Sequence, residues 1–564
     1  MLSAYADDTT FFVQDIESVN NIFELFHQFS SFSGFKLNHS KCELCGIGAL
    51  KGVKTALCNV KNVNLEKESI KILGIYYTYN KKVHIEKNFM TVLTKIRNVL
   101  NVWKFRNLSL FGKITIFKTL AISSIIFVSH MSSVPREILN SLNDLHCDFI
   151  WDGKKRKIKH STLIGDYHQG GLKDVDVDTK ILALQLSWIK RLHDDNFHPW
   201  KILPSFLLEK YFSNKSSLFY PNLNFNRTVE FTKLPVFYQN ILNSWSLFSK
   251  ASPSTASSIL SECIWQNAFI KIESEPIGPH FLNLCKNIYI CDCFDKNGAI
   301  IKWEIFKENQ DLPNCFYFKW RQLIDAIPKP WVRIIKNDKG DSRKFIDRSP
   351  HLLSKARIIP LKKLNSKEFY NINIQSKFAT PSSQKSIATL LSDNVLPWKE
   401  IYLLAFSTSI DSFSRIFQYK ILNNILFLNN TLYKMGKVSS PLCSYCNVEK
   451  ETISHLFLEC KITKRVWSQL QNYFASNLDI PNLNLQSAVV GYLDHPNKLF
   501  LNNLLLTFKM VLYKYRNRKA ISMNLIVKNM LARKQIEENI AREKNKIEYH
   551  DKKWKIFDDI LSSN

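Results

Sequence analysis

The sequence predicts an α+β protein with a short β-rich segment at the N-terminus, mostly helical regions after it, and a small metal-binding module. Three observations support this fold class. Short apolar runs broken by turn residues occur up to about residue 85, the pattern of hairpins. Apolar residues then recur at helical spacing through much of the chain. Near the C-terminus, the pair Cys443 and Cys446 is followed by His455 and Cys460.

Composition favours a nucleic acid as the partner of this chain. The 564 residues are 45% hydrophobic, which is enough for several buried cores. Its 77 lysines and arginines against 49 aspartates and glutamates give a net charge of +28. Such an excess favours a polyanion, with nucleic acid first and an anionic membrane surface second. A basic protein without such a partner is the plainer alternative.

The chain shows neither a long uninterrupted apolar run nor a secretory signal. Asp7 and Asp8 stand where a signal peptide would need its apolar core. We therefore expect an intracellular protein, in the nucleus or the cytoplasm, that is not secreted and has no membrane partner. In that setting the 12 cysteines predict free thiols with one metal site rather than a disulfide framework.

The first predicted element is a β-hairpin over residues 3–12 that lifts Asp7 and Asp8 into its turn. Two adjacent carboxylates repel each other and need a counter-charge. At a site that handles phosphates, this charge is usually Mg²⁺, which one or two carboxylates and the substrate phosphates hold. A surface turn is the plainer reading of this short motif.

An amphipathic helix follows, with Asp15 as its N-cap and Gly34 as its C-terminal stop. Residues 32–43 predict a turn that leads into a short strand and carries Lys41. A lysine beside a metal–carboxylate site can contact triphosphate oxygens or protonate a leaving pyrophosphate, whereas simple solvation is the alternative. Residues 69–77 predict one further strand, in which Gly74 permits close backbone approach.

Two helical stripes then predict a helical bundle between residues 89 and 121. Its cations Lys104, Arg106 and Lys113 are placed in sequence to meet backbone phosphates, although a solvated helix face explains them equally well. The densest basic run follows with Lys154, Lys155, Arg156 and Lys157. This run can neutralise phosphates, serve as a nuclear-import signal, or be an exposed loop, and its position favours nucleic-acid contact.

The C-terminal cysteine cluster predicts a closed zinc site. Cys443 and Cys446 present two thiolates to one ion. The helical-looking stretch that follows supplies an imidazole from His455 and a third thiolate from Cys460. Four soft ligands complete a tetrahedral site with no open position, so the Zn²⁺ is structural. After it, residues 500–519 predict an amphipathic helix that turns basic, and residues 532–555 a charged, exposed helix. This tail can bind nucleic acid or be only solvated.

Several of these motifs together resemble LINE-type (non-LTR) retrotransposon reverse transcriptases. The match begins with Tyr5-Ala6-Asp7-Asp8, the run from Gly34 to Lys41, and Leu73-Gly74-Ile75. It continues with the run from Trp103 to Ile114, with Gly170-Gly171-Leu172, and with the zinc cluster. The resemblance implies a C-terminal palm remnant over 1–85, a helical thumb over 86–195, a connector over 196–395, a zinc-binding domain over 396–480 and a basic helical tail over 481–564.

The resemblance also implies roles for single residues. Asp7 would bind Mg²⁺ with support from Asp8, Lys41 would face the triphosphate, and Tyr5 would pack by the primer terminus. Gly74 would lie in the primer-grip turn. The implied activity is RNA-directed DNA polymerisation with two Mg²⁺ ions, acting on an RNA template and a DNA primer or target.

Part of that machinery has no counterpart in this sequence. Family members carry another metal-binding aspartate, the fingers and most of the palm upstream of the hairpin, where this sequence has only residues 1–4. We therefore expect a truncated fragment that binds RNA or DNA and lacks polymerase activity alone. The alternatives are a non-catalytic nucleic-acid-binding protein with a structural zinc, and a transposon relic with no selected function.

Overall fold

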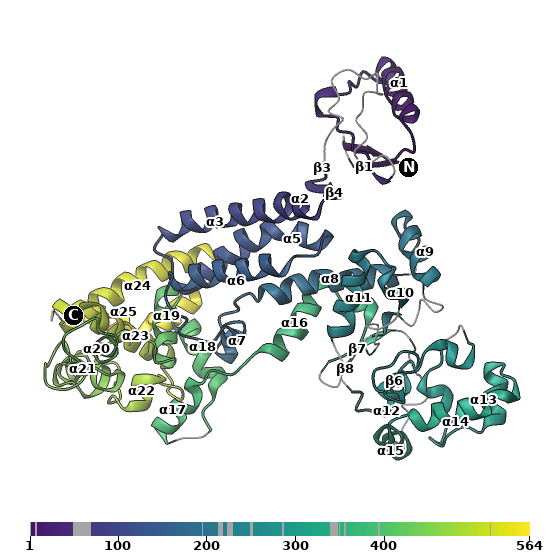
Figure 1. The fold of residues 1–564 in the computed structure, drawn as a ribbon. Coiled ribbons are helices and arrows are strands. Elements are labelled where there is room, and N and C mark those ends of the chain that lie inside the picture. The colour runs from purple at the N-terminus through teal and green to yellow at the C-terminus, as the bar shows by residue number, and fades with distance from the viewer. Residues whose placement is uncertain are drawn as a thin grey trace. The chain divides into compact units, whose positions relative to one another are not determined.

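The structure, a computed structural model, is rich in helices, and its strands pair only as short hairpins in the part of the chain that it describes (Figure 1). The helix-rich α+β class predicted from the sequence is confirmed. The described residues are 2–5, 8–48, 69–194, 196–211, 218–220, 222, 229–248, 252–284, 287–338, 348, 350–354, 357–392, 395–518 and 521–563.

The chain forms two compact units that alternate along the sequence. Unit 1 comprises Met1–Val102, Leu120–Leu145 and Val177–Tyr370, and unit 2 comprises Trp103–Thr119, His146–Asp176 and Asn371–Asn564. The division into five segments that the family resemblance implies stays a prediction.

Unit 1 begins with the predicted hairpin, in which β1 (Leu2–Tyr5) pairs antiparallel with β2 (Asp8–Phe11). Asp8 lies within β2 opposite Tyr5, whereas the sequence predicted both aspartates in the turn. Helix α1 (Ile16–Ser33) follows with the predicted caps. The Asp15 side chain accepts a hydrogen bond from the Ser18 N–H, and Gly34 ends the helix in the left-handed region at φ 74°.

Two local predictions in this segment are wrong. Residues 39–41 form a 3₁₀ turn (His39–Lys41), so the short strand expected around Lys41 is absent there. The single strand expected over 69–77 is a second hairpin of β3 (Ser69–Ile72) and β4 (Ile75–Thr78). Leu73 and Gly74 both have positive φ, 47° and 87°, and two such residues in succession turn the chain back on itself.

The other elements of unit 1 are mostly helices, and α8 packs against both α5 and α11. Helices α3, α6 and α16 continue across the boundary between the units. The elements are α2 (Lys81–Ile85), a π turn (Glu86–Met90), α3 (Thr91–Lys104), α5 (Ile122–Met131), α6 (Arg136–Trp151), α8 (Val177–His193), α9 (Ile202–Tyr211), α10 (Val229–Thr232), α11 (Val236–Phe248), α12 (Ala256–Leu260), β5 (Lys271–Ile272), β6 (Glu275–Pro276), α13 (Trp303–Gln310), α14 (Tyr317–Ala326), α15 (Lys329–Asn337), β7 (His351–Ser354), β8 (Arg357–Pro360) and α16 (Ser366–Lys377).

Unit 2 is built on a large apolar core between residues 387 and 560. Its elements are α4 (Leu110–Ile116), α7 (His160–Leu163), α17 (Ser383–Leu391), α18 (Trp398–Thr408), α19 (Ser412–Leu422), α20 (Asn429–Lys434), a π turn (His455–Glu459), α21 (Lys461–Phe474), α22 (Leu485–Val489), α23 (Lys498–Tyr515), α24 (Met523–Glu543) and α25 (Ile547–Ser563). Helices α18, α19, α24 and α25 all pack against α23, which is the centre of this core (Figure 1).

Part of the C-terminal tail, which the sequence predicted to bind nucleic acid or to be solvated, packs into the core of unit 2. Every residue from Phe500 to Lys509 is buried, so α23 is a core helix rather than an amphipathic one. The charged stretch after it is broken near Asn545 into α24 and α25, which pack together. Trp554 and Phe557 of α25 are fully buried, and these two aromatic residues decide its position.

One helical run in the described part of the chain, Leu110–Met131, is long and apolar enough to cross a membrane by length and composition alone. One third of its most apolar window is buried inside the protein, including Ile114, Phe117 and Ile125. A core helix of this composition passes the same test, so the absence of a membrane partner stays a prediction.

Candidate zinc centre and the basic loop of unit 2

The four predicted zinc ligands come together in unit 2. Cys443 and Cys446 lie on a tight turn whose ends are joined by a bridge between Leu442 and Lys450. The Asn447 N–H donates to the Cys443 carbonyl, 2.9 Å away, and Asn447 itself has a positive φ of 54°. The turn thus directs both thiols to one side, the arrangement that one metal ion requires.

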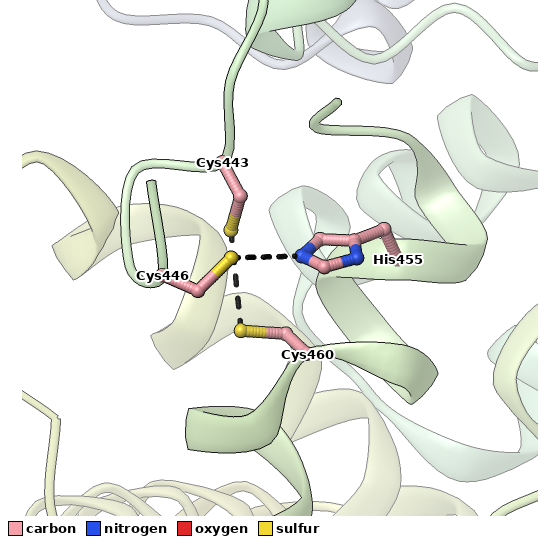
Figure 2. Close-up of side chains that lie close together, drawn as sticks. All are labelled: Cys443, Cys446, His455 and Cys460. Atoms are coloured by element: carbon pink, nitrogen blue, oxygen red, sulfur yellow. Dashed lines mark hydrogen bonds between the residues drawn. The ribbon is translucent and has the colours of Figure 1, made fainter. Parts of the chain in front are cut away.

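His455 and Cys460 reach the same point from the segment that follows. His455 begins the π turn, and Cys460 immediately precedes α21. The extra residue of a π turn shifts side-chain directions within a helical segment. Here His455 at its start and Cys460 just after its end both face the thiols of Cys443 and Cys446 (Figure 2). All four ligand atoms lie within 4.8 Å of one another, and Cys443, His455 and Cys460 are buried.

The distances between these atoms fit zinc. Thiolates about 2.3 Å from a tetrahedral Zn²⁺ lie roughly 3.8 Å apart, and a thiolate and an imidazole nitrogen lie roughly 3.6 Å apart. The Sγ atoms of Cys443 and Cys460 are 4.0 Å apart, and Cys446 Sγ is 3.3 Å from His455 Nε2 (Figure 2). Since all four donors are protein groups, a bound ion would have no open position for substrate.

The cluster lowers the thiol pKa of two of its cysteines. The hydrogen bond from Cys443 lowers the pKa of Cys460 to about 5, with help from the backbone N–H groups of Thr463 and Ile462 in the first turn of α21. The pKa of Cys443 is raised because its thiol is the donor. At Cys446, burial raises the pKa, but hydrogen bonds from the N–H groups of Glu449 and Val448 and with the His455 and Cys443 side chains together leave it lowered.

A carboxylate orients the imidazole of the cluster. Glu449 Oε2 lies 3.2 Å from His455 Nδ1, the nitrogen that does not face the thiols. A carboxylate at this nitrogen holds the proton there and leaves Nε2 as the metal-binding atom.

A buried acid, Glu451, joins the cysteine turn to the rest of unit 2. Its fully buried carboxylate accepts hydrogen bonds from the backbone N–H of Ser444 at 2.9 Å and of Asn429 at 3.0 Å. Arg516, at the end of α23, approaches the same carboxylate with its Nε 3.4 Å away. The Tyr445 hydroxyl also donates to the Leu512 carbonyl of α23 at 2.9 Å. The turn is thereby fixed to the central helix of the unit.

The predicted basic run, Lys154 to Lys157, lies in a loop of residues 152–159, here called the basic loop, which contacts the segment that leads into the zinc cluster. Lys157 places its amine 3.3 Å from the centroid of the Phe427 ring. Burial, together with the nearby amines of Lys420 and Lys154, lowers the pKa of Lys157 to about 8. Burial and Lys113 likewise lower the pKa of Lys420. Like charges from three separate segments therefore meet at one place in unit 2.

The other predicted cations differ in their partners. Lys104 forms an ion pair with Asp148 and Lys113 with Asp152, and the Lys113 side chain is only 12% exposed. The Arg156 Nε donates to the Cys147 sulfur at 2.9 Å. Arg156 is nevertheless exposed, as are Lys154 and Lys155. Arg106 is also exposed.

The residues predicted for the polymerase site lie in unit 1. Asp7 lies outside the described residues. Asp8, Tyr5 and Lys41 are exposed, and Gly74 forms the turn between β3 and β4. Within the described part of the chain, no hydrogen bond or ion pair links Lys41 to Asp8. Their roles stay predictions.

Sequence reasoning missed Glu451, Arg516, Phe427 and Lys420. Glutamate and lysine are usually surface residues, so Glu451 and Lys420 read as exposed. No local sequence pattern distinguishes a buried charge from an exposed one. The sequence offered one signal for Lys420. Phe417, three residues earlier and therefore on the same helix face, is apolar, as is the next residue, Ile421, so Lys420 borders a buried face.

Comparison with known proteins agrees with this geometry. Residues 387–467 match the family described as zinc-binding in reverse transcriptase, and this stretch contains all four ligands. The chain is also 25% identical over 281 residues to the "Transposon TX1 uncharacterized 149 kDa protein" of Xenopus laevis. That alignment covers 48% of this chain and 21% of the relative, so the chain spans about a fifth of the relative's length. The family match implies zinc binding, and the Cys₃His donor set fits it.

Proposed function

We propose, from the confirmed resemblance of this chain to the C-terminal region of a non-LTR retrotransposon reverse transcriptase, that unit 2 binds the phosphate backbone of RNA or DNA. The partners would be the RNA template and the DNA primer or target that the resemblance implies. In this proposal the zinc is structural, and the basic loop and its neighbours supply the contacts.

The observation that carries the proposal is the meeting of like charges around Lys157. Folding has placed Lys154, Lys157 and Lys420 near one another although their mutual repulsion opposes it. Among the described residues these three amines form no ion pair, whereas Lys113, which lowers the pKa of Lys420, is paired with Asp152. A polyanion would supply the missing counter-charge, and each neutralised phosphate would release condensed counterions.

Contacts within unit 2 link the predicted zinc cluster to the lysines around Lys157. Phe427, which lies under the Lys157 amine, precedes α20 by a few residues, and its carbonyl accepts a hydrogen bond from Arg516 at 2.8 Å. Arg516 in turn approaches Glu451, the acid that holds the cysteine turn. The metal cluster and the basic loop are thus linked through three residues of the same unit, Phe427, Arg516 and Glu451.

Salt-dependent binding of labelled RNA and DNA tests the proposal. We expect the double variant Lys154→Gln/Lys157→Gln to bind more weakly and to lower the slope of log K against log salt by roughly one to two, about 0.7 to 0.9 per lost phosphate contact. The matched control is Lys552→Gln/Lys555→Gln, which removes the same charge from exposed positions of α25. Equal affinity and slope in the two double variants would contradict the proposal.

We also propose that the hairpin of β1 and β2 contributes to a Mg²⁺ site for RNA-directed DNA polymerisation, with Asp7 as a ligand and Asp8 in support. What supports it is the exposed position of Asp8 at the start of β2, where its carboxylate is open to a cation. Since we expect the chain alone to lack polymerase activity, binding of Mn²⁺ in place of Mg²⁺ tests this role and should weaken in Asp7→Ala. Equal Mn²⁺ binding by the wild type and this variant would contradict the role, and primer extension by the wild type would contradict the expected inactivity.

A further inference from the structure

A second cluster of metal-ligating side chains lies in unit 2, away from the four zinc ligands in sequence. His146 is in α6, His160 begins α7, and Asp174 follows the Gly170-Gly171 pair. Their ligand atoms all lie within 4.8 Å of one another. The side chain of Asp174 is fully buried, that of His146 is 6% exposed and that of His160 is 22% exposed.

Two atoms of this cluster have no hydrogen-bond partner. Asp174 Oδ1 accepts from the Val175 N–H at 2.8 Å and is hydrogen-bonded to His146 Nε2 at 3.0 Å. The other oxygen, Oδ2, is buried and unpartnered, and so is the His160 Nε2 that faces it at 3.6 Å. A buried carboxylate oxygen without a donor is costly, so this position calls for an additional group between the two atoms.

The surroundings of His160 indicate what this group is. Its other nitrogen, Nδ1, points to Asp176 Oδ2 at 3.8 Å, and the second oxygen of Asp176 accepts from the Lys377 amine at 2.8 Å. A carboxylate at Nδ1 favours the tautomer whose proton is on that nitrogen. Nε2 then presents a lone pair to the lone pairs of Asp174 Oδ2. In that tautomer two acceptors face each other, and a cation between them removes their repulsion.

We propose that His146, His160 and Asp174 bind a zinc ion. Ligand atoms about 2.0–2.1 Å from a tetrahedral Zn²⁺ lie roughly 3.3–3.4 Å apart. Asp174 Oδ2 and His160 Nε2 are 3.6 Å apart, close to that value, and His146 Nε2 would exchange its 3.0 Å hydrogen bond to Oδ1 for the ion. Two imidazoles and a carboxylate are ligands that zinc accepts, and water completes the coordination on the side of His160, the most exposed member.

The proposed ion has a clear structural consequence. His146 and His160 stand at either end of the segment that contains the basic loop, residues 152–159. Asp174 connects both histidines to the loop after Gly171. An ion on these three side chains therefore fixes both ends of the basic loop. This inference concerns metal binding alone and does not depend on the proposed nucleic-acid contact.

Metal content of the full-length chain tests the proposal. After desalting of zinc-loaded protein, we expect one equivalent of zinc in addition to that of the Cys₃His cluster. An organomercurial reagent, which displaces zinc from thiolates, should release only the cluster's equivalent and leave the other bound. The His160→Gln variant should lose the additional equivalent, whereas the control His168→Gln, an exposed histidine nearby, should keep it.

Two results would overturn the proposal. One is a wild-type chain that retains no zinc after the mercurial treatment. The other is a His160→Gln variant that binds as much zinc as the wild type. Far-UV circular dichroism of both variants shows whether the fold is retained, and Asp174→Asn provides an independent variant with the same shape and one fewer charge.

Discussion

Single buried charges hold the zinc module to its unit. Glu451 accepts hydrogen bonds from two backbone N–H groups on separate segments and forms an ion pair with Arg516. Removal of such a group leaves several buried donors without an acceptor, and that penalty exceeds the net stability that the intact pair contributes. The position therefore tolerates few substitutions although it makes no contact with the metal.

We expect Glu451→Ala to destabilise the zinc-loaded chain by about 3–5 kcal/mol, the typical cost of breaking a buried charged network. Urea denaturation followed by near-UV circular dichroism measures this change. The control Glu400→Ala removes an exposed acid of α18 and should stay within about 0.5 kcal/mol of wild type. A similar small effect for Glu451→Ala would contradict the assigned role.

Lys509 is the second buried charge with a measurable consequence. Its amine, in the middle of α23, donates to Gln418 Oε1 at 2.9 Å and to the Ala488 carbonyl at 3.0 Å. Burial lowers its pKa to about 7. Above that pH the folded state holds this amine neutral while the unfolded state still binds its proton, up to about pH 10.4.

Because the unfolded state binds more protons in this window, Lys509 should make the free energy of unfolding rise with pH between about 7 and 10. The slope is at most roughly 1.4 kcal/mol per pH unit. In Lys509→Met this contribution is absent. Between pH 7 and pH 9 the free energy of unfolding of the wild type should therefore rise relative to that of the variant. Urea denaturation at both pH values measures the difference, and parallel pH profiles of the two proteins would refute the assignment.

At the scale of elements, the loop after α7 shows why two adjacent glycines are needed. A Cβ at Gly171 would lie 2.0 Å from the Gly165 carbonyl oxygen, a backbone atom that cannot rotate away. Gly170 has a φ of +85°, and a Cβ there would meet the Tyr402 ring and Pro381. The pair allows this loop to pack tightly enough for the Gly171 N–H to donate to the Asp166 carbonyl at 3.0 Å.

We therefore expect Gly171→Ala to destabilise unit 2 by about 3 kcal/mol, since the backbone must shift to admit the methyl group. Gly112→Ala in α4 is the matched control. Its Cβ would make only ordinary contacts at 3.4 Å or more, and the lower backbone entropy of alanine should stabilise the helix by up to about 1 kcal/mol. Thermal denaturation of both variants measures the contrast, and equal shifts would exclude the proposed clash.

At the scale of the whole molecule, the two compact units have separate cores. The unit 1 helices α5, α8 and α11 pack together, and the Trp188 indole donates to the His130 carbonyl at 2.8 Å. The unit 2 core surrounds α23 and includes Cys443 and Cys460. Loss of metal should therefore act on unit 2 first, because only that core contains zinc ligands among the described residues.

Removal of zinc with a chelator under reducing conditions should open the segment from residue 442 to residue 474. Hydrogen–deuterium exchange measures this opening as faster exchange at the π turn and in α21. Peptides from α8 in unit 1 serve as the internal control and should keep their exchange rates. Unchanged exchange between residues 442 and 474 after metal removal would show that zinc does not hold the module.

The sequence predicted the parts of the fold that local rules govern. Asp15 and Gly34 mark the start and the end of α1 as predicted. The Asp15 cap and the left-handed Gly34 each act within one turn of the helix, so sequence alone reveals them. The hairpin turn at Leu73 and Gly74 escaped prediction, since leucine rarely adopts positive φ and its neighbours read as one strand. The tail was misread because charge alone does not reveal that Trp554 and Phe557 are buried.

By itself, the sequence determined the helix-rich α+β class, the resemblance to transposon reverse transcriptases and the Cys₃His ligand set, because each depends on spacing along the chain. Only the tertiary structure decided which distant charges meet. It brought Lys420 to Lys157, Arg516 to Glu451, and Asp174 to His146 and His160. The physical reason is that burial and proximity set the energy of a charge, and both arise from packing between segments far apart in sequence.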